Sequence, residues 1–218
     1  MSLRLVEGWV DEELALEFPG LRIAELTAPV PPSRTPPGVR ERLRVLADRY
    51  HGARAVALRS EPIPSAYRAF YREVGLDPEV QRPAAEEAAA DRLMRGGFGS
   101  GAALPDAQLL AVVETGVPVW ALDDRGLEGV LGLRQARTGE RLGEGPLASD
   151  LPGGRVVVAD TRVPVAVLFG AVAAGHEPGK SALRLRLFTV GVPGVPRIHV
   201  EEALWTCAEA LEGDLARG

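Results

Sequence analysis

Several features that define large protein classes are missing or scarce in this chain. The 218 residues include one cysteine, Cys207, which excludes an internal disulfide and agrees with a reducing compartment. The longest apolar run, residues 163–174, is about twelve residues long, whereas a helix needs about 20 to span a membrane. The first residues lack the basic stretch and cleavage site of an export signal. We therefore expect a cytoplasmic protein that does not enter a membrane.

The charge balance excludes some kinds of partner. The net charge of −5 argues against a general nucleic-acid coat, because non-specific binding depends on neutralising phosphates. A local patch that contacts RNA is still compatible with this charge. The three histidines and one cysteine show no zinc-binding spacing, so we expect neither a metal nor another cofactor.

The order of hydrophobic patterns predicts a mixed α/β fold. A chain of this length can form one large domain with a substantial core. Helical patterns dominate the first half and the C-terminus, whereas the second half is mostly strands. We expect a single domain over residues 1–218, with a core over about 18–212, in which helices flank the sheets.

The most complete local pattern spans residues 104–132. Pro105 and Asp106 suit the first turn of a helix, and Gly116 suits a left-handed C-terminal cap. Residues 117–122 then predict a buried strand, and 127–133 a second strand that returns after a turn.

The remaining elements follow from periodicity and capping residues. Further helices are predicted over 11–17, 39–50, 66–74, 84–94 and 199–216. Further strands are predicted over 3–9, 21–26, 55–58, 130–136, 155–160, 163–169 and 182–190. In the last of these strands, leucines alternate with Arg184 and Arg186.

Three segments have both a structural and a functional interpretation. The aromatic side chains Tyr67, Phe70 and Tyr71 can stack on bases, but their helical spacing favours core packing. The glycine-rich residues 96–101 lack the GxxxxGK[ST] pattern of a phosphate-binding loop, so a linker is favoured. The proline-rich residues 28–38 predict an exposed extended loop rather than a ligand for a proline-binding module.

The densest group of chemically useful side chains lies at residues 176–181. His176 beside Glu177 can act as a base, although adjacent residues in a loop more often face solvent. Asp123 and Asp160 each end a predicted strand, where they can help to bind a substrate, although aspartate at such a position commonly caps a turn. Trp120 can form the wall of an amino-acid pocket or pack in the core.

The order of several motifs resembles the B3/B4 domain of the bacterial phenylalanyl-tRNA synthetase beta subunit, in its free-standing form. These motifs are a G-x-P-x-x-A-x-D strand at 116–123, a strand and turn ending in G-E at 129–140, and a V-x-A-D strand at 157–160. Residues 69–78 are similar to the entry into the central helices of free-standing members. The resemblance covers most of the chain, from about residue 18 to 211.

The resemblance implies both a fold and an activity. It implies helices packed against a β-sandwich of unusual topology, and hydrolysis of mischarged aminoacyl-tRNA or a related aminoacyl ester. The partners implied are tRNA and an amino acid. The small-residue segment that contains Gly170, Ala173 and Gly175 corresponds to the part of the family domain that holds the substrate. Glu177 is the nearest counterpart of a glutamate that helps to bind or hydrolyse it.

Some positions depart from the family pattern. Trp120 stands where synthetase members commonly carry histidine, and Gln108 and Ala111 stand where they carry Asp and Asn. Nothing in the chain resembles the catalytic core of a complete synthetase. Three hypotheses are therefore open: a free-standing aminoacyl-ester hydrolase, a non-catalytic module that binds RNA or an amino acid, and an interaction scaffold that uses its proline-rich loop.

Overall fold

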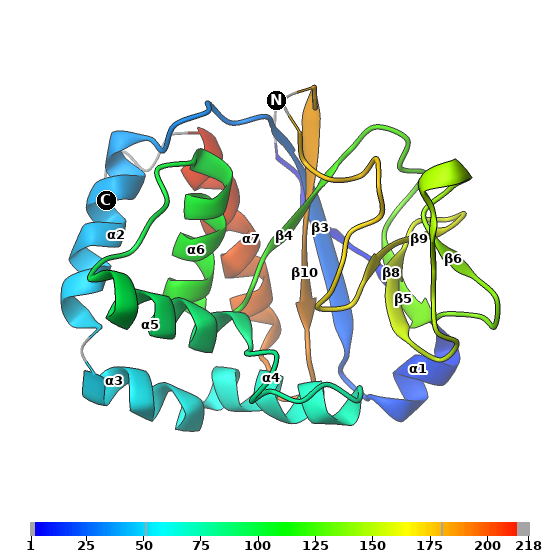
Figure 1. The fold of residues 1–218 in the computed structure, drawn as a ribbon, viewed down its shortest axis with the longest axis horizontal. Coiled ribbons are helices and arrows are strands. Elements are labelled where there is room, and N and C mark those ends of the chain that lie inside the picture. Colours follow the sequence, from blue (N-terminus) through cyan, green and yellow to red (C-terminus); the bar gives the residue numbers. More distant parts are fainter. Residues whose placement is uncertain (1–2, 51, 180, 213–218) are drawn as a thin grey trace. The chain divides into compact units, whose positions relative to one another are not determined.

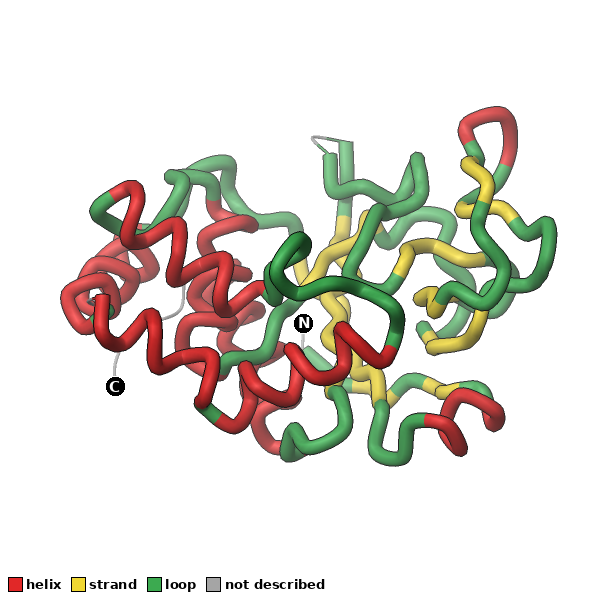
Figure 2. Tube along the Cα trace, turned by 60° about the horizontal axis from the view of Figure 1, so that its bottom comes forward, coloured by secondary structure: helices red, strands yellow, loops and turns green. Residues whose placement is uncertain are grey.

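The computed structural model describes residues 3–50, 52–179 and 181–212. The chain forms two compact units, each built from two separate segments. One unit, here called the β unit, comprises residues 3–28 and 121–188. The other, here called the helical unit, comprises residues 29–120 and 189–212 within the described ranges. Most strands belong to the first unit, and the long helices to the second (Figures 1 and 2). The coarse expectation of a mixed α/β protein is confirmed.

Two four-stranded sheets and one small sheet account for the strands. The first has the order β1-β3-β10-β4 and contains β1 (Val6–Glu7), β3 (Arg22–Pro29), β10 (Arg184–Gly191) and β4 (Trp120–Asp123). The second has the order β2-β5-β8-β9 and contains β2 (Trp9–Val10), β5 (Gly132–Gln135), β8 (Val156–Ala159) and β9 (Pro164–Val167). The small sheet pairs β6 (Arg141–Leu142) with β7 (Ser149–Asp150), and a 3-10 turn, η2 (Gly145–Leu147), lies between them.

The first predicted strand is divided between the two large sheets. β1 pairs with β3 in one sheet, whereas β2 pairs with β5 in the other, so one continuous strand over 3–9 is wrong. The change of partner occurs at Gly8, whose N–H donates to the carbonyl of Ile23 at 2.8 Å. A Cβ added at Gly8 would lie 2.2 Å from the carbonyl oxygen of Leu131. The crossing therefore requires glycine, because the two backbones approach too closely for any side chain.

The helix predicted from the central pattern is confirmed, but the hairpin after it is wrong. α6 (Ala103–Thr115) ends at Gly116, whose φ of 76° gives the expected left-handed cap. The next two strands, β4 and β5, lie in different sheets. The connection from residue 124 to 131 is thus a loop between sheets, and its last N–H, on Leu131, donates to the Glu25 carboxylate at 2.9 Å.

The helical unit contains six α-helices within its described residues. They are α2 (Pro37–Arg49), α3 (Gly52–Ala57), α4 (Pro62–Glu73), α5 (Ala84–Arg95), α6 and α7 (Arg197–Glu212). The strand predicted over 55–58 is wrong: α3 and a 3-10 turn, η1 (Leu58–Ser60), occupy this region. α6 packs along α7, and the α7 residues Leu204 and Cys207 are fully buried, as their helical spacing predicts.

Two further expectations are settled by burial and capping. Tyr67, Phe70 and Tyr71 on α4 are at most 5% exposed, so the core interpretation is confirmed. Asp11 caps the short helix α1 (Glu12–Glu17) by accepting the N–H of Glu13 at 3.1 Å.

Among the residues described, none of the helices combines the length and apolar character that crossing a bilayer would require.

A buried aspartate organises the glycine-rich linker before α6. Asp106 is 1% exposed, and its carboxylate accepts bonds from the Ser100 N–H at 2.5 Å, the Ser100 hydroxyl at 3.0 Å and the Gly101 N–H at 3.0 Å. The hydroxyl of Thr35 donates a fourth bond at 2.5 Å. The linker is thus tied to the first turn of the helix, where a negative side chain is favourable.

Candidate functional site

The segment that carries His176 is attached to the end of β4. The N–H of Asp123 donates to the His176 carbonyl oxygen at 2.8 Å, and the His176 N–H donates to the Ala173 carbonyl oxygen at 3.0 Å. The imidazole lies beside the loop that follows β4, since its Cε1 is 3.8 Å from the position that a Cβ on Gly126 would occupy. The structure therefore brings together Asp123 and His176, two of the predicted site residues.

The imidazole of His176 has an unusual hydrogen-bonding state. The residue is half-buried, and its Nδ1 is shielded from solvent with no hydrogen-bond partner among the described residues. Buried polar atoms in folded proteins nearly always have such a partner. An imidazole nitrogen without one is free to accept or donate a bond to a ligand, and nothing within the described residues fixes its tautomer.

The carboxylate of Asp123 forms an ion pair with Arg125 and makes no hydrogen bond to the His176 imidazole within the described residues. Its side chain is 1% exposed and accepts from the Arg125 guanidinium, with Nη2 to Oδ2 at 2.7 Å and Nε to Oδ2 at 3.1 Å. It also accepts the Arg125 N–H at 3.1 Å. The side-chain bonds to Arg125 lower the pKa of Asp123 below its ordinary value, and the nearby charge of His176 contributes in the same direction. Asp123 is therefore an anion at neutral pH.

Arg125 extends this group of residues to the surface. Its Nη2 also donates to the Ser181 hydroxyl at 3.0 Å, and the arginine side chain is 54% exposed. A half-exposed guanidinium keeps donors available for a carboxylate, a phosphate or a developing oxyanion. The Asp123–Arg125–Ser181 contacts and the His176 imidazole together form what we call the β4-end site.

Asp160 has a structural role at another turn. Its carboxylate accepts the N–H groups of Glu128, Arg162 and Val163 at 3.0, 2.8 and 2.8 Å. It is 3% exposed, so these three bonds satisfy most of its acceptor positions under the loop that leaves β4. The turn-capping interpretation accounts for Asp160, whereas its expected role in substrate binding stays a prediction.

The small-residue segment is a return turn rather than a strand. After β9 the chain turns through Phe169, which has a φ of 56°, and Val172 forms an isolated bridge with Ala166. Ala173 is 1% exposed and packs in an apolar cluster. Gly170 and Gly175 are exposed, and Gly175 has a φ of 94°, which favours glycine.

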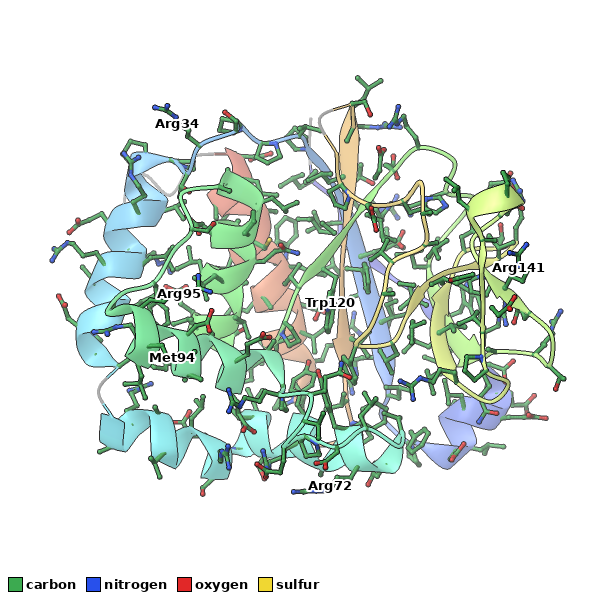
Figure 3. The ribbon with its side chains drawn as sticks, viewed as in Figure 1. Arg34, Arg72, Met94, Arg95, Trp120 and Arg141 are labelled. Atoms are coloured by element: carbon green, nitrogen blue, oxygen red, sulfur yellow. The ribbon has the colours of Figure 1, made fainter. Side chains whose placement is uncertain are left out.

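The two remaining predicted residues are less constrained. Glu177 is exposed, and no contact of its side chain is recorded within the described part of the chain. Trp120 is half-buried at the start of β4, and Figure 3 labels its side chain. Both of their predicted roles stay predictions.

A buried ion network beside Asp123 was not apparent from the sequence. Arg186 bonds Glu25 at 2.7 Å and Asp124 at 2.7 Å, and Arg184 lies 3.2 Å from the same aspartate. Burial raises the pKa of Glu25 despite its bonds from Leu131 and Arg186. The alternation of β10 predicted a polar face for both arginines. It could not show that Arg186, 12% exposed, would be covered and paired with β3.

The described residues contain no group of three or more metal-ligating side chains close enough to hold an ion. Neither a comparison with models of protein families nor one with curated proteins finds a match for this chain. The β4-end site and the order of the motifs are therefore the observations that bear on function.

Proposed function

We propose that this chain hydrolyses an aminoacyl ester, such as a mischarged aminoacyl-tRNA, at the β4-end site. The observation that carries the proposal is the shielded, unpartnered Nδ1 of His176 next to the ion pair of Asp123 and Arg125. A nitrogen without a protein partner is a position where a water molecule or a substrate can bind, as general-base catalysis requires. The motif order supports the aminoacyl ester as the substrate class.

The residues of the site match the needs of ester hydrolysis. His176 takes a proton from a water molecule as the water oxygen attacks the ester carbonyl carbon. The carbonyl oxygen becomes an oxyanion, which the half-exposed Arg125 guanidinium stabilises. The ester C–O bond then breaks, the proton on His176 passes to the leaving alkoxide, and a free amino acid and the tRNA hydroxyl are released.

Asp123 acts in this scheme as a positioning residue. Its backbone N–H holds the carbonyl of His176, and its carboxylate holds Arg125 in place. Its negative charge also favours the imidazolium that forms during the reaction. Glu177, one residue further along, lies in solvent and corresponds to the family glutamate by resemblance.

A second candidate is a module that binds the aminoacyl group or RNA without hydrolysis. The observation that favours it is on α6, where synthetase members carry Asp and Asn. Gln108 donates its amide to the carbonyl of Val119 at 3.1 Å, and Ala111 is fully buried. Neither residue supplies a carboxylate, and the Gln108 amide already donates to the backbone.

The test is deacylation of a panel of mischarged tRNAs by the purified chain, with Glu177→Ala and His176→Ala alongside. The proposal expects release of one amino acid well above the buffer rate, slowed at least tenfold by His176→Ala. Binding of the same tRNA without release would favour the non-catalytic module. Neither release nor binding with any member would overturn both candidates.

A further inference from the structure

A hollow in the helical unit shares no residue with the β4-end site. α3, η1, α4, α6 and α7 contribute to its lining, and its volume is about 490 Å³. Pockets for small ligands range over about 300–1,000 Å³ and combine apolar walls with a few polar groups. We call it the α4–α6 pocket, after the helices whose ends meet in it.

The walls of the α4–α6 pocket are largely hydrocarbon. Its lining includes Leu58, Ile63, Pro64, Val113 and Pro196. Gly116 lies against the same wall, since a Cβ added there would be 3.1 Å from Cγ2 of Ile63. Such walls contribute to binding by burying the apolar part of a ligand. They also disfavour a bare metal ion, which needs oxygen ligands on several sides.

Three of the polar side chains that line the pocket are carboxylates. Glu61 and Glu202 line it, and within the described residues no arginine is recorded in an ion pair with either. The contact recorded for Glu202 is Nδ1 of His199 at 3.4 Å, an ion pair only when the histidine is protonated. α6 also ends here, at Thr115 and Gly116, so the negative end of its helix dipole faces the pocket.

The lining has fewer cationic groups than carboxylates. The Arg54 guanidinium is one of them, and it lies 5.0 Å from the centroid of the Tyr50 ring, in a cation–π contact. α4 begins with Pro62 and has Pro64 two residues later, so two N–H groups that a helix start usually offers are missing. The third acidic residue, Glu114, is neutralised by Arg42, which bonds both of its oxygens at 2.6 and 2.7 Å.

From this arrangement we propose that the α4–α6 pocket binds a small organic ammonium compound. Its alkyl or aryl part packs on the wall formed by Ile63 and Pro196. Its ammonium group is held by the carboxylates of Glu61 and Glu202 near the end of α6. A carboxylate ligand would meet like charges, and a neutral one would gain only the apolar contact.

An isoleucine in the pocket wall can report ligand binding by NMR. The chain contains three isoleucines, of which Ile63 lines the pocket, Ile23 is fully buried in β3, and Ile198 is 69% exposed on α7. The full chain labelled at isoleucine δ1-methyl groups therefore gives three signals, each assignable by an Ile→Val substitution. The probes are hexylammonium, hexanol and hexanoate at constant ionic strength.

The proposal expects saturable movement of the Ile63 signal with hexylammonium, and dissociation constants at least tenfold weaker for hexanol and hexanoate. Glu61→Gln and Glu202→Gln each weaken hexylammonium binding at least fivefold. The control is Glu209→Gln, at an exposed glutamate that lies on α7 like Glu202 but outside the pocket, and it leaves hexylammonium binding unchanged. Binding of hexanoate as tight as that of hexylammonium would overturn the proposal, as would no saturable movement of Ile63. Insensitivity to both glutamine variants would overturn it too.

Discussion

The N–H of Asp123 donates a 2.8 Å hydrogen bond to the carbonyl oxygen of His176, which joins the end of β4 to the segment that carries the imidazole. This backbone bond does not depend on the side chain of either residue. Substitutions of Asp123 and His176 can therefore remove their chemistry while the connection between the two segments is kept.

Asp123→Asn tests the contribution of the ion pair with Arg125. The pKa of Asp123 is lowered in the folded protein, so the pair stabilises the fold above the ordinary aspartate pKa. This stability is lost as the pH falls through the lowered pKa. We expect the variant to lose about 1 kcal/mol at pH 7, since Arg125 is half in water, and the gap to narrow at an acid pH below the ordinary aspartate pKa. Urea unfolding at both pH values measures it. An equal gap at the two pH values would contradict this account.

Arg186→Met tests the buried ion network. It leaves Glu25 buried without its guanidinium bond, and we expect a loss of about 3 kcal/mol at pH 7. Burial already raises the pKa of Glu25, and losing Arg186 raises it further. Protonation of Glu25 then removes the penalty, so the variant should recover stability relative to wild type as the pH falls from neutral towards the raised pKa of Glu25. Urea unfolding of Arg184→Met, at the more exposed arginine, is the control and should change by under 1 kcal/mol.

Asp106→Ala removes the acceptor of four hydrogen bonds at the glycine-rich linker. Because the two N–H donors of Ser100 and Gly101 become unsatisfied, we expect a loss of about 3 kcal/mol in chemical denaturation. Thr35→Val removes one donor only and should cost about 1 kcal/mol. A loss for Asp106→Ala no larger than that for Thr35→Val would show that the linker does not depend on this carboxylate.

Gly8→Ala tests the crossing between the two sheets of the β unit. The added Cβ would lie 2.2 Å from the Leu131 carbonyl oxygen and 2.6 Å from Ile23 Cγ2, so the backbones must separate. We expect a loss of about 3 kcal/mol, against almost none for Gly97→Ala, where no atom lies within 4 Å. Thermal unfolding of the two alanine variants side by side gives the comparison. Equal stability would contradict the close approach.

Local patterns predicted the helices better than the strands. Each correct prediction concerned a single helix, in which residues close in sequence determine the structure. Examples are the apolar spacing and glycine cap of α6, the Asp11 cap of α1 and the aromatic face of α4. Pairing partners were not predictable, because β4 and β5 are consecutive in sequence but belong to different sheets. Residues 55–58 were misassigned because a short apolar run has no periodicity long enough to separate a strand from a helix.

The candidate site was predictable only as a set of residue types. The sequence indicated His176 and Asp123 as useful side chains but could not show that the chain brings them together. Whether the nitrogen of His176 is satisfied depends on tertiary contacts that no motif encodes. The α4–α6 pocket had no sequence signal either, since its lining comes from five separate elements.

The proposed hydrolysis depends most directly on the imidazole of His176. The decisive measurement is the single-turnover rate of amino-acid release from the best mischarged tRNA, for wild type, His176→Ala and His199→Ala. His199 is a partly exposed histidine of the helical unit and serves as the matched control. We predict a rate at least tenfold lower for His176→Ala and an unchanged rate for His199→Ala. Equal rates for all three proteins would contradict the assignment of His176 as the base.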